Sequence, residues 1–277
     1  MRRRSQGGVA RRRRSRGGVA LVLVLWLVVV LGVIGAGIVA GARTSTAMAA
    51  NVRARVIARY AAESGIEALV STVEDSLEHA SGVSARRAFL NGLQSAYGRG
   101  DSVVLGEGRF APVVVDVSAR LDINAATETA LRSFFSRFTD LAGAATIARD
   151  IRGHIESGAI DGRPDEVFLQ RDPRGDFRPV RPLRSLDELR ERRLVPEQVL
   201  ERAVPYLTID GDGVINRRTA SDTVLAAASG EIHDEPSRLL FISRGWHGGH
   251  PMTHEIQAVY ALSGTHLVLV HWRERDL

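Results

Sequence analysis

The chain has 277 residues, of which 44% are hydrophobic and 25% are charged, so its composition fits one medium domain or two small ones and excludes wholesale disorder. The formal net charge is +5, but eight of the 37 basic residues are arginines in the first 18 positions, and the acidic residues outnumber the basic ones in the rest of the chain. A broadly basic body, as nucleic-acid-binding proteins have, is therefore excluded. Cysteine is absent, which excludes disulfides, thiolate nucleophiles and Cys-based zinc sites.

An uncharged segment follows the arginines. It extends from Gly17 to Ala42, and Val19–Ala42 is an apolar run. At about 1.5 Å per residue this run forms roughly 36 Å of helix, which is enough to cross a hydrocarbon core of about 30 Å. Arginines before it and mixed charges after it predict a cytoplasmic N-terminus and a body outside the cytoplasm, which is the periplasm in a Gram-negative cell. The sequence thus predicts a single-pass protein of the inner membrane.

The junction Arg16-Gly17-Gly18-Val19 resembles a type IV prepilin signal, in which a short basic leader ends in Gly directly before an apolar helix. In that family a membrane peptidase cuts after the Gly and methylates the new N-terminus. The resemblance implies cleavage between Gly18 and Val19. Most pilins carry a Glu four residues further on, where this chain has Leu23. The K component of type II secretion systems typically lacks this Glu.

Two other fates of the segment remain open. The first is a single-pass anchor without processing. In the second, ordinary signal peptidase cuts at the small-x-small site Ala47-Met48-Ala49 and releases a soluble protein. The pair Gly37 and Gly41 forms a GxxxG motif, which is weak evidence for helix pairing.

Apolar residues continue at spacings of three and four beyond the membrane run, so one helix is expected to extend to about His79. The expected organisation is a leader over 1–18, a transmembrane helix over 19–42, its periplasmic continuation over 43–80, strands over 81–120, an inserted helical subdomain of helix-hairpin-helix or SAM type over 121–230, and C-terminal strands over 231–277. This order predicts an α+β fold: a long N-terminal helix packed on a small antiparallel sheet, with a large all-α insertion.

Within this frame, β-branched runs predict strands and 3.6-residue periodicity predicts helices. The expected strands are Val103–Leu105, Val113–Val117, Arg238–Ser243, Glu255–Leu262 and Thr265–Trp272. The expected helices are Glu128–Phe138, Leu141–Ile155, Leu186–Arg193 and Glu197–Val204. Asp161–Pro182, which is rich in proline and charge, is expected to be a surface loop.

Two similar stretches, Leu121–Thr127 and Gly213–Ala220, each place an Asn directly after Ile and before an expected helix. Asn124 and Asn216 are therefore expected to order the turn and to help satisfy free N–H groups at the helix start. With Leu23, Leu183–Leu189, Val204–Thr208 and Val270–Glu274, these stretches resemble the general secretion pathway protein K family over nearly the whole chain.

The resemblance implies a pilin-like fold and a minor pseudopilin at the tip of a type II secretion pseudopilus. It also implies its partners: the minor pseudopilins I and J, other pseudopilins, a prepilin peptidase and an inner-membrane secretion platform.

A DNA-uptake protein is the alternative, because Ile-Asn-Ala-Ala also opens helix-hairpin-helix DNA-binding domains. Such a hairpin needs a Gly-x-Gly whose N–H groups meet a phosphate. The corresponding region, Phe138–Ala145, has only Gly143 and adds Asp140. With an acidic body as well, nucleic acid is not expected as a partner.

Two patterns raise the question of a metal. His247, His250 and His254, with Glu255, have spacings that suit a metal, but histidines in a Gly-Pro loop are more often simply solvated. Asp210-Gly211-Asp212-Gly213 resembles part of a calcium loop, with Asp210 and Asp212 as ligands, although a plain Asp-Gly turn is the simpler interpretation. Apart from this possible calcium, no cofactor is expected.

Catalysis is not expected. The sequence has no Gly-x-Ser-x-Gly, no His-Glu-x-x-His and no phosphate-binding Gly-Lys-Ser/Thr loop. Its acids mostly alternate with Arg, as in Asp187–Arg193, which is typical of a solvated helix face. The sequence gives no reason to expect an enzyme.

Overall fold

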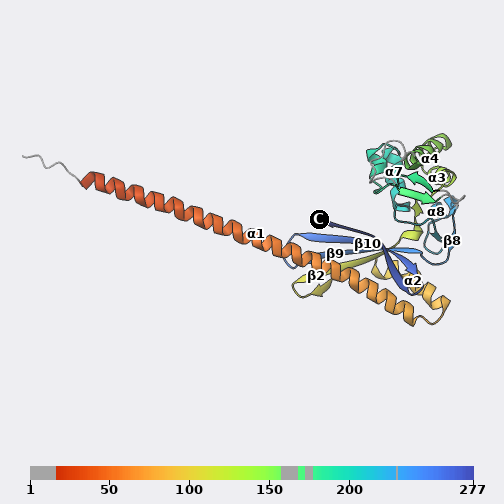
Figure 1. Cartoon of the computed structure of the whole chain (residues 1–277), viewed down its shortest axis with the longest axis horizontal. Helices are drawn as coiled ribbons and strands as arrows, with labels where there is room; N and C mark the ends of the chain where they lie inside the picture. The colour runs from red at the N-terminus through yellow and green to blue at the C-terminus, as the bar shows by residue number, and fades with distance from the viewer. Residues whose placement is uncertain (1–16, 157–167, 172–176, 229) are drawn as a thin grey trace, which may run out of the picture. The chain divides into compact units, whose positions relative to one another are not determined.

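The computed structural model describes residues 17–156, 168–171, 177–228 and 230–277 (Figure 1). The chain divides into two compact units, one up to Arg53 and one over Ala54–Leu277. Helix α1, Gly17–His79, contributes to both. The predicted end of this helix at His79 is confirmed, and its length reflects a stretch without proline.

The first unit consists of the N-terminal part of α1 as far as it is described. The exposed large apolar side chains from Leu21 to Val39 each leave more than half of their surface accessible. The stretch Ala20–His79 contains a window long and apolar enough to cross a membrane, by length and composition, and it is the one such helix among the described residues. An apolar surface of this extent requires a nonaqueous environment or a partner.

The second unit contains a five-stranded antiparallel sheet in the order β1-β2-β9-β10-β11. Its strands are β1 Val103–Leu105, β2 Gly108–Asp116, β9 Arg238–His247, β10 Thr253–Ser263 and β11 His266–Asp276. The long connection between β2 and β9 holds the inserted helices, so the predicted antiparallel sheet with a helical insertion is confirmed.

One face of this sheet packs against α1 and α2, Val83–Tyr97. Side chains alternate between the two faces along each strand. The buried residues that face the helices have even numbers in β2 and β10 and odd numbers in β9. We call residues 54–120 and 231–277 the sheet subdomain. Its core is Ala62, Ile66, Leu69, Val73, Leu77, Leu90, Leu93, Val114, Leu239, Phe241, Ile256, Ala258 and Tyr260.

The close packing of α1 on β9 depends on small residues. A Cβ at Gly245 would overlap the backbone O of Ala58 and the backbone N of Ala62. Ala58 and Ala62 are fully buried. The helix backbone therefore lies directly on the strand at this point, which only glycine in the strand allows.

The helical subdomain, residues 121–230, has a separate core. Its helices are α3 Glu128–Phe135, α4 Leu141–Glu156, α6 Glu188–Glu191, α7 Glu197–Ala203 and α8 Asp222–Ala227. Figure 1 shows them gathered in one cluster. Its core includes Ile123, Leu131, Phe134, Phe135, Ile147, Ile151, Ile155, Leu189, Leu200 and Leu207. Two short strand pairs lie within this part: β3 Leu121–Asp122 with β6 Leu207–Thr208, and β4 Phe168–Arg171 with β5 Phe177–Val180. A third pair, β7 Ile215–Asn216 with β8 Ile232–His233, connects it to the sheet subdomain.

The structure corrects several expected elements. Helix α2 lies where only strands were expected, and it is placed by Leu90 and Leu93, which lie one turn apart and enter the sheet core. The segment expected as a loop contains β4 Phe168–Arg171 and β5 Phe177–Val180. Its residues 161–167 and 172–176 lie outside the described residues. Pro179 is tolerated there because a two-stranded ribbon consists only of edges.

Three expected helices are shorter in the structure. Helix α3 ends at Phe135 because the N–H groups of Arg137 and Phe138 bond to carbonyls three residues back, which tightens the chain into turns. Helix α6 covers only Glu188–Glu191, and α7 ends at Ala203 before a 3₁₀ turn over Val204–Tyr206.

Candidate functional site: the apolar helix and the junction of the two cores

The predicted cleavage point lies in the first turn of α1. The helix begins at Gly17, so the peptide bond between Gly18 and Val19 is part of it. Leu23 is exposed and lies in a stretch where all neighbours are apolar or Gly. This part of the chain offers no catalytic chemistry, and its apolar surface suits contact with lipid or with other apolar helices.

The two cores are joined through a buried polar network around Asn216. Its side-chain amide is fully buried and donates to Asp116 Oδ2 of β2 at 2.7 Å and to Asn91 Oδ1 of α2 at 2.8 Å. The hydroxyl of Thr219 donates to the same Asp116 oxygen. Burial raises the pKa of Asp116, and hydrogen bonds from Thr219 and Asn216 oppose this. These bonds fasten the helical subdomain to the sheet subdomain.

Asn124 performs a different task. Its amide exchanges two hydrogen bonds with the backbone of Leu183, donating to the carbonyl at 3.0 Å and accepting from the N–H at 2.8 Å. It therefore ties together segments 59 residues apart inside the helical subdomain. The expected ordering of the turn is confirmed for Asn216, whose Oδ1 accepts the N–H of Arg218 at 3.1 Å. The expected help at the helix start comes from other residues: Thr127 caps α3 and Ser221 caps α8, each accepting a backbone N–H three residues on.

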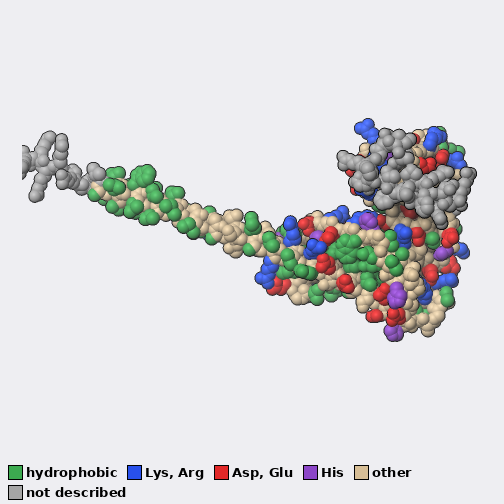
Figure 2. Space-filling model, viewed as in Figure 1, with side chains coloured by type: hydrophobic (Ala, Val, Ile, Leu, Met, Phe, Trp, Pro, Cys, Tyr) green, Lys and Arg blue, Asp and Glu red, His purple; other side chains and the backbone are tan. Residues whose placement is uncertain are grey.

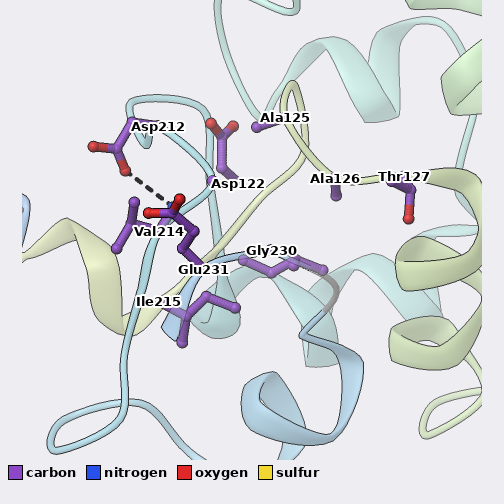
Figure 3. A pocket seen from close by; sticks show the side chains of 11 residues that line it. Asp122, Ala125, Ala126, Thr127, Asp212, Val214, Ile215, Gly230 and Glu231 are labelled. Atoms are coloured by element: carbon purple, nitrogen blue, oxygen red, sulfur yellow. Dashed lines mark hydrogen bonds between the residues drawn. The ribbon is translucent and has the colours of Figure 1, made fainter. Parts of the chain in front are cut away.

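A pocket opens beside this junction, with a volume of about 520 Å³ (Figure 3). Eleven residues line it: Leu121, Asp122, Ala125, Ala126, Thr127, Asp212, Gly213, Val214, Ile215, Gly230 and Glu231. Its three titratable side chains are all acidic. Arg238 lies 3.7 Å from Asp212 and its charge also acts on Asp122, so part of this acidic charge is compensated within the chain.

The buried acid of this pocket is Asp122. Burial raises its pKa from 3.8 to about 6, while the backbone N–H groups of Asn124 and Ala125 and the charge of Arg238 oppose the rise. Asp212 is held by the backbone N–H of Val214, drawn dashed in Figure 3, and by the Ser237 hydroxyl. The pKa of Asp122 is therefore closer to neutral pH than that of a free aspartate.

A second buried acid, Glu255, lies on the face of the five-stranded sheet that points away from α1 and α2. It accepts hydrogen bonds from Arg244 at 2.6 Å, from Arg275 at 2.6 and 3.0 Å and from Gln257 at 2.7 Å. Burial works against ionisation, but these bonds outweigh it and lower the pKa of Glu255. Each arginine lies directly across from Glu255 on a neighbouring strand, so this network holds three strands in register.

The comparisons with known proteins point in one direction. The PilX N-terminal family matches residues 16–67. A chain of the crystal structure of the GspK-GspI-GspJ complex from the type 2 secretion system of enterotoxigenic Escherichia coli superposes with a TM-score of 0.56 at 12% sequence identity, over 84% of this chain and 99% of that chain. A search of curated protein sequences found no match.

The chain has a pilin-like fold. The fold class expected from the sequence is thereby confirmed, including the inserted helical subdomain. The fold is shared with a chain of the GspK-GspI-GspJ complex, and the N-terminal helix matches a pilin-type N-terminal family.

This pilin-like fold does not bring the predicted metal ligands together. His254 and Glu255 are neighbours on β10, so their side chains point to opposite faces of the sheet. His254 lies between Asp276 at 2.8 Å and Glu274 at 3.1 Å, and Glu255 is held by arginines. His247 lies at the same end of the β9–β10 hairpin as His254, but its ring is 3.9 Å from Glu107, which precedes β2.

The two aspartates of the predicted calcium loop form ion pairs with arginines. Asp210 pairs with Arg273, and Asp212 lies 3.7 Å from Arg238. Across the described part of the chain, no three His, Asp or Glu side chains form a group that would hold a metal. The geometry therefore gives calcium no support at Asp210 and Asp212.

In a helix-hairpin-helix motif, the turn between α3 and α4 would bind a phosphate of DNA. The N–H of Gly143, which would meet a phosphate in such a motif, donates to the carboxylate of Asp140 at 2.7 Å. A phosphate would have to displace this carboxylate and would be repelled by it. The turn thus gives no support to DNA binding.

Proposed function

We propose that this chain is a minor pseudopilin of a type II secretion system, the K-type subunit, and that its role is mechanical rather than catalytic. The observation that carries the proposal is the fold likeness to a chain of the GspK-GspI-GspJ complex over 99% of that chain, which includes the helical subdomain as well as the sheet. A shared N-terminal helix alone would suit many pilin-like proteins. The large insertion between β2 and β9 is what makes the likeness specific.

In this proposal α1 has two tasks. Its apolar part anchors the chain in the inner membrane and packs beside neighbouring subunits, and its second part, from Ala54, forms the core of the periplasmic domain. The PilX N-terminal match begins at Arg16, two residues before the proposed cleavage after Gly18. This supports a leader over 1–18 that a prepilin peptidase removes, followed by methylation of Val19.

The proposed position is the tip of the pseudopilus, with the I and J minor pseudopilins and on the inner-membrane secretion platform. In pilins the Glu that is missing here normally pairs with the N-terminal amine of the subunit already in the fibre, so Leu23 suits a subunit with nothing above it. A helical insertion of this size also enlarges the periplasmic domain beyond what a repeating shaft would pack. There the complex would prime assembly and support export of folded proteins through the outer membrane.

The mature N-terminus tests the first step of this proposal. The full chain is purified from membranes of cells with and without a prepilin peptidase, and its N-terminal peptide is identified by mass spectrometry. We expect a methylated Val19 only when the peptidase is present. Gly18→Arg places a bulky charge at the cleavage point and is expected to leave Met1 in place, whereas Gly8→Arg, in the earlier copy of the Gly-Gly-Val-Ala sequence, is expected to be processed normally.

Each alternative gives a distinct result. A start at Ala50 would mean cleavage by ordinary signal peptidase and a released protein, which contradicts the proposal. An unprocessed chain in peptidase-positive cells would leave a simple membrane anchor. Salt-dependent binding of duplex DNA by the purified full chain would instead favour the DNA-uptake alternative.

A further inference from the structure

Strand β11 forms a long open edge of the five-stranded sheet. It has eleven residues and pairs only with β10 among the described strands, whereas the opposite edge, β1, has three residues. The N–H of Leu267 points away from β10 and donates to Glu74 of α1 at 2.8 Å. Because the hydrogen-bonding direction alternates along an antiparallel strand, Leu269, two residues on, also directs its backbone groups away from β10.

The charged half of β11 is occupied by contacts within the chain. Arg273 pairs with Asp210, Glu274 with His254 and Arg59, Arg275 with Glu255, and Asp276 with His254 and Arg55. These contacts hold the end of β11 to α1, β10 and the helical subdomain. Charges at an edge normally discourage pairing with another chain, but here they lie only on residues 273–276.

The other half of β11 is apolar and exposed. Val268 is 53% exposed, Leu269 49%, Val270 46% and Trp272 38%. Natural proteins protect such edges with charges, proline, a β-bulge or a cover. This half of β11 has a bulge at Val270 but no charge or proline, and it exposes four large apolar side chains within five residues. We call residues 268–272 the apolar edge. Figure 2 shows hydrophobic side chains gathered on the sheet, over the strands labelled β9 and β10 in Figure 1.

We propose that the apolar edge is a docking site for an extended, uncharged strand of a neighbouring pilin-like subunit, which pairs with β11 and extends the sheet. An open strand edge selects another strand because only an extended backbone offers alternating donors and acceptors at the right spacing. The five residues cover about 17 Å of strand. They include a bulge at Val270, which lies opposite no residue of β10, so the partner strand pairs with β11 on either side of that bulge. The inference rests on the proposed function, since it names the surface by which the K-type subunit contacts a partner.

The choice of occupant follows from the same observations. The partner strand must be apolar, since the charges of residues 273–276 are already paired within the chain. It must also belong to a protein that is held nearby, because a pairing of about five residues is weak by itself. A second pilin-like subunit anchored in the same membrane satisfies both conditions. The similar chain was solved in a complex with two other subunits, which supports this choice.

A matched pair of lysine variants tests the docking site. The full chain is co-expressed with the I- and J-type pseudopilins of its own secretion system and purified in detergent. Val270→Lys adds a charge to the apolar edge and is expected to lower the recovered complex about tenfold, equivalent to about 1.4 kcal/mol. Val104→Lys, at a residue that is 62% exposed on the opposite edge, is expected to change it less than about twofold.

A single-thiol crosslink identifies the occupant. The chain has no cysteine, so Val270→Cys provides a unique site for a photoactivatable thiol reagent. We expect a crosslink to the I- or J-type subunit from Val270→Cys and none from Val104→Cys. A crosslink only between two copies of this chain, or an unchanged complex with Val270→Lys, would overturn the docking proposal and leave the pseudopilin assignment standing. Failure of the wild-type chain to form any complex would overturn both.

Discussion

Two asparagines that look equivalent in the sequence have unequal environments in the structure. Asn124 bonds to backbone groups within one core, whereas Asn216 bonds to the side chains of Asp116 and Asn91 across the boundary between two cores. A buried carboxylate that loses a donor is costly, since its desolvation is no longer compensated. Asn216 is therefore expected to contribute more than Asn124 to the stability of the contact between the two subdomains.

Asn216→Ala is expected to lower the free energy of unfolding by about 2–3 kcal/mol, because it leaves the buried Asp116 carboxylate and Asn91 each without one donor. Urea unfolding of the full chain in detergent, followed by tryptophan fluorescence, measures the loss. Arg217→Ala is the control: its side chain is 61% exposed and its nearest acid, Asp234, lies 3.9 Å away. A change within about 0.5 kcal/mol is expected there.

Asp122 gives the pocket a pH dependence. Because burial raises its pKa to about 6, the folded chain binds this proton more tightly than the unfolded chain does. The resulting stabilisation is fully present below the unfolded pKa of 3.8 and is lost as the pH rises through about 6. Asp122→Asn keeps an acceptor for the N–H of Asn124 but does not titrate.

We therefore expect the stability of Asp122→Asn relative to wild type to increase between about pH 4 and pH 7, by on the order of 2–3 kcal/mol. Urea unfolding at several pH values measures the difference. Asp101→Asn, at an exposed position, controls for the general effect of removing a negative charge. A difference that stays constant with pH would show that Asp122 titrates normally in the folded chain.

Among the secondary-structure elements, the contact of α1 with β9 positions the rest of the sheet subdomain. Ala54, Ala58, Ala61 and Ala62 form a buried stripe of small residues on the helix, and Gly245 faces it from the strand. Such a contact has little tolerance for added volume, because the atoms that a new side chain meets belong to the helix backbone.

Gly245→Ala is expected to destabilise the sheet subdomain by about 3 kcal/mol, because the new methyl group pushes α1 away from β9. Gly248→Ala is the matched control: the nearest atom to its Cβ would be the Glu107 carbonyl oxygen at 3.6 Å, an ordinary contact. Thermal unfolding of both variants measures the difference. Equal transition temperatures would mean that α1 and β9 are further apart than described.

The sequence predicted those elements whose signal is local. The 3.6-residue periodicity extends to His79, and β-branched runs mark β9, β10 and β11. Helix α2 was missed because only Leu90 and Leu93 are buried in it, too few to give a clear period. Strand ends and the exposed edge of β11 depend on pairing partners far along the chain, which no local pattern encodes.

The candidate site shows the same limit. The Ile-Asn motifs drew attention to Asn124 and Asn216, but their partners lie 59 to 125 residues away in the sequence. Spacing also suggested a metal site at His254 and Glu255, although adjacent strand residues face opposite sides of a sheet. Spacing in the sequence predicts which side chains lie close together only when the type of secondary-structure element is known.

At the scale of the whole molecule, one helix serves two environments. From Ala54 onward α1 buries alanines and larger apolar residues against the sheet, whereas its apolar N-terminal part buries almost nothing within the chain. The second unit holds the two described apolar cores, each lined by residues after Arg53. The N-terminal part of α1 therefore contributes little to the stability of the second unit, which fits the anchoring and assembly proposed for it.

The double substitution Val28→Arg with Val29→Arg tests this division. Each arginine near the centre of a membrane helix costs about 2.5–3.5 kcal/mol on insertion, so the chain is expected to lose membrane association. Sedimentation of membranes after carbonate extraction measures it. Thr44→Arg with Thr46→Arg adds the same charge just beyond the apolar run and should leave the chain in the membrane pellet, because arginines there reach the interface.

The unfolding transition of the second unit should be the same in both variants, since neither changes a residue of its two cores. If Val28→Arg with Val29→Arg lowered that transition instead, the apolar part of α1 would belong to the folded domain rather than to the membrane.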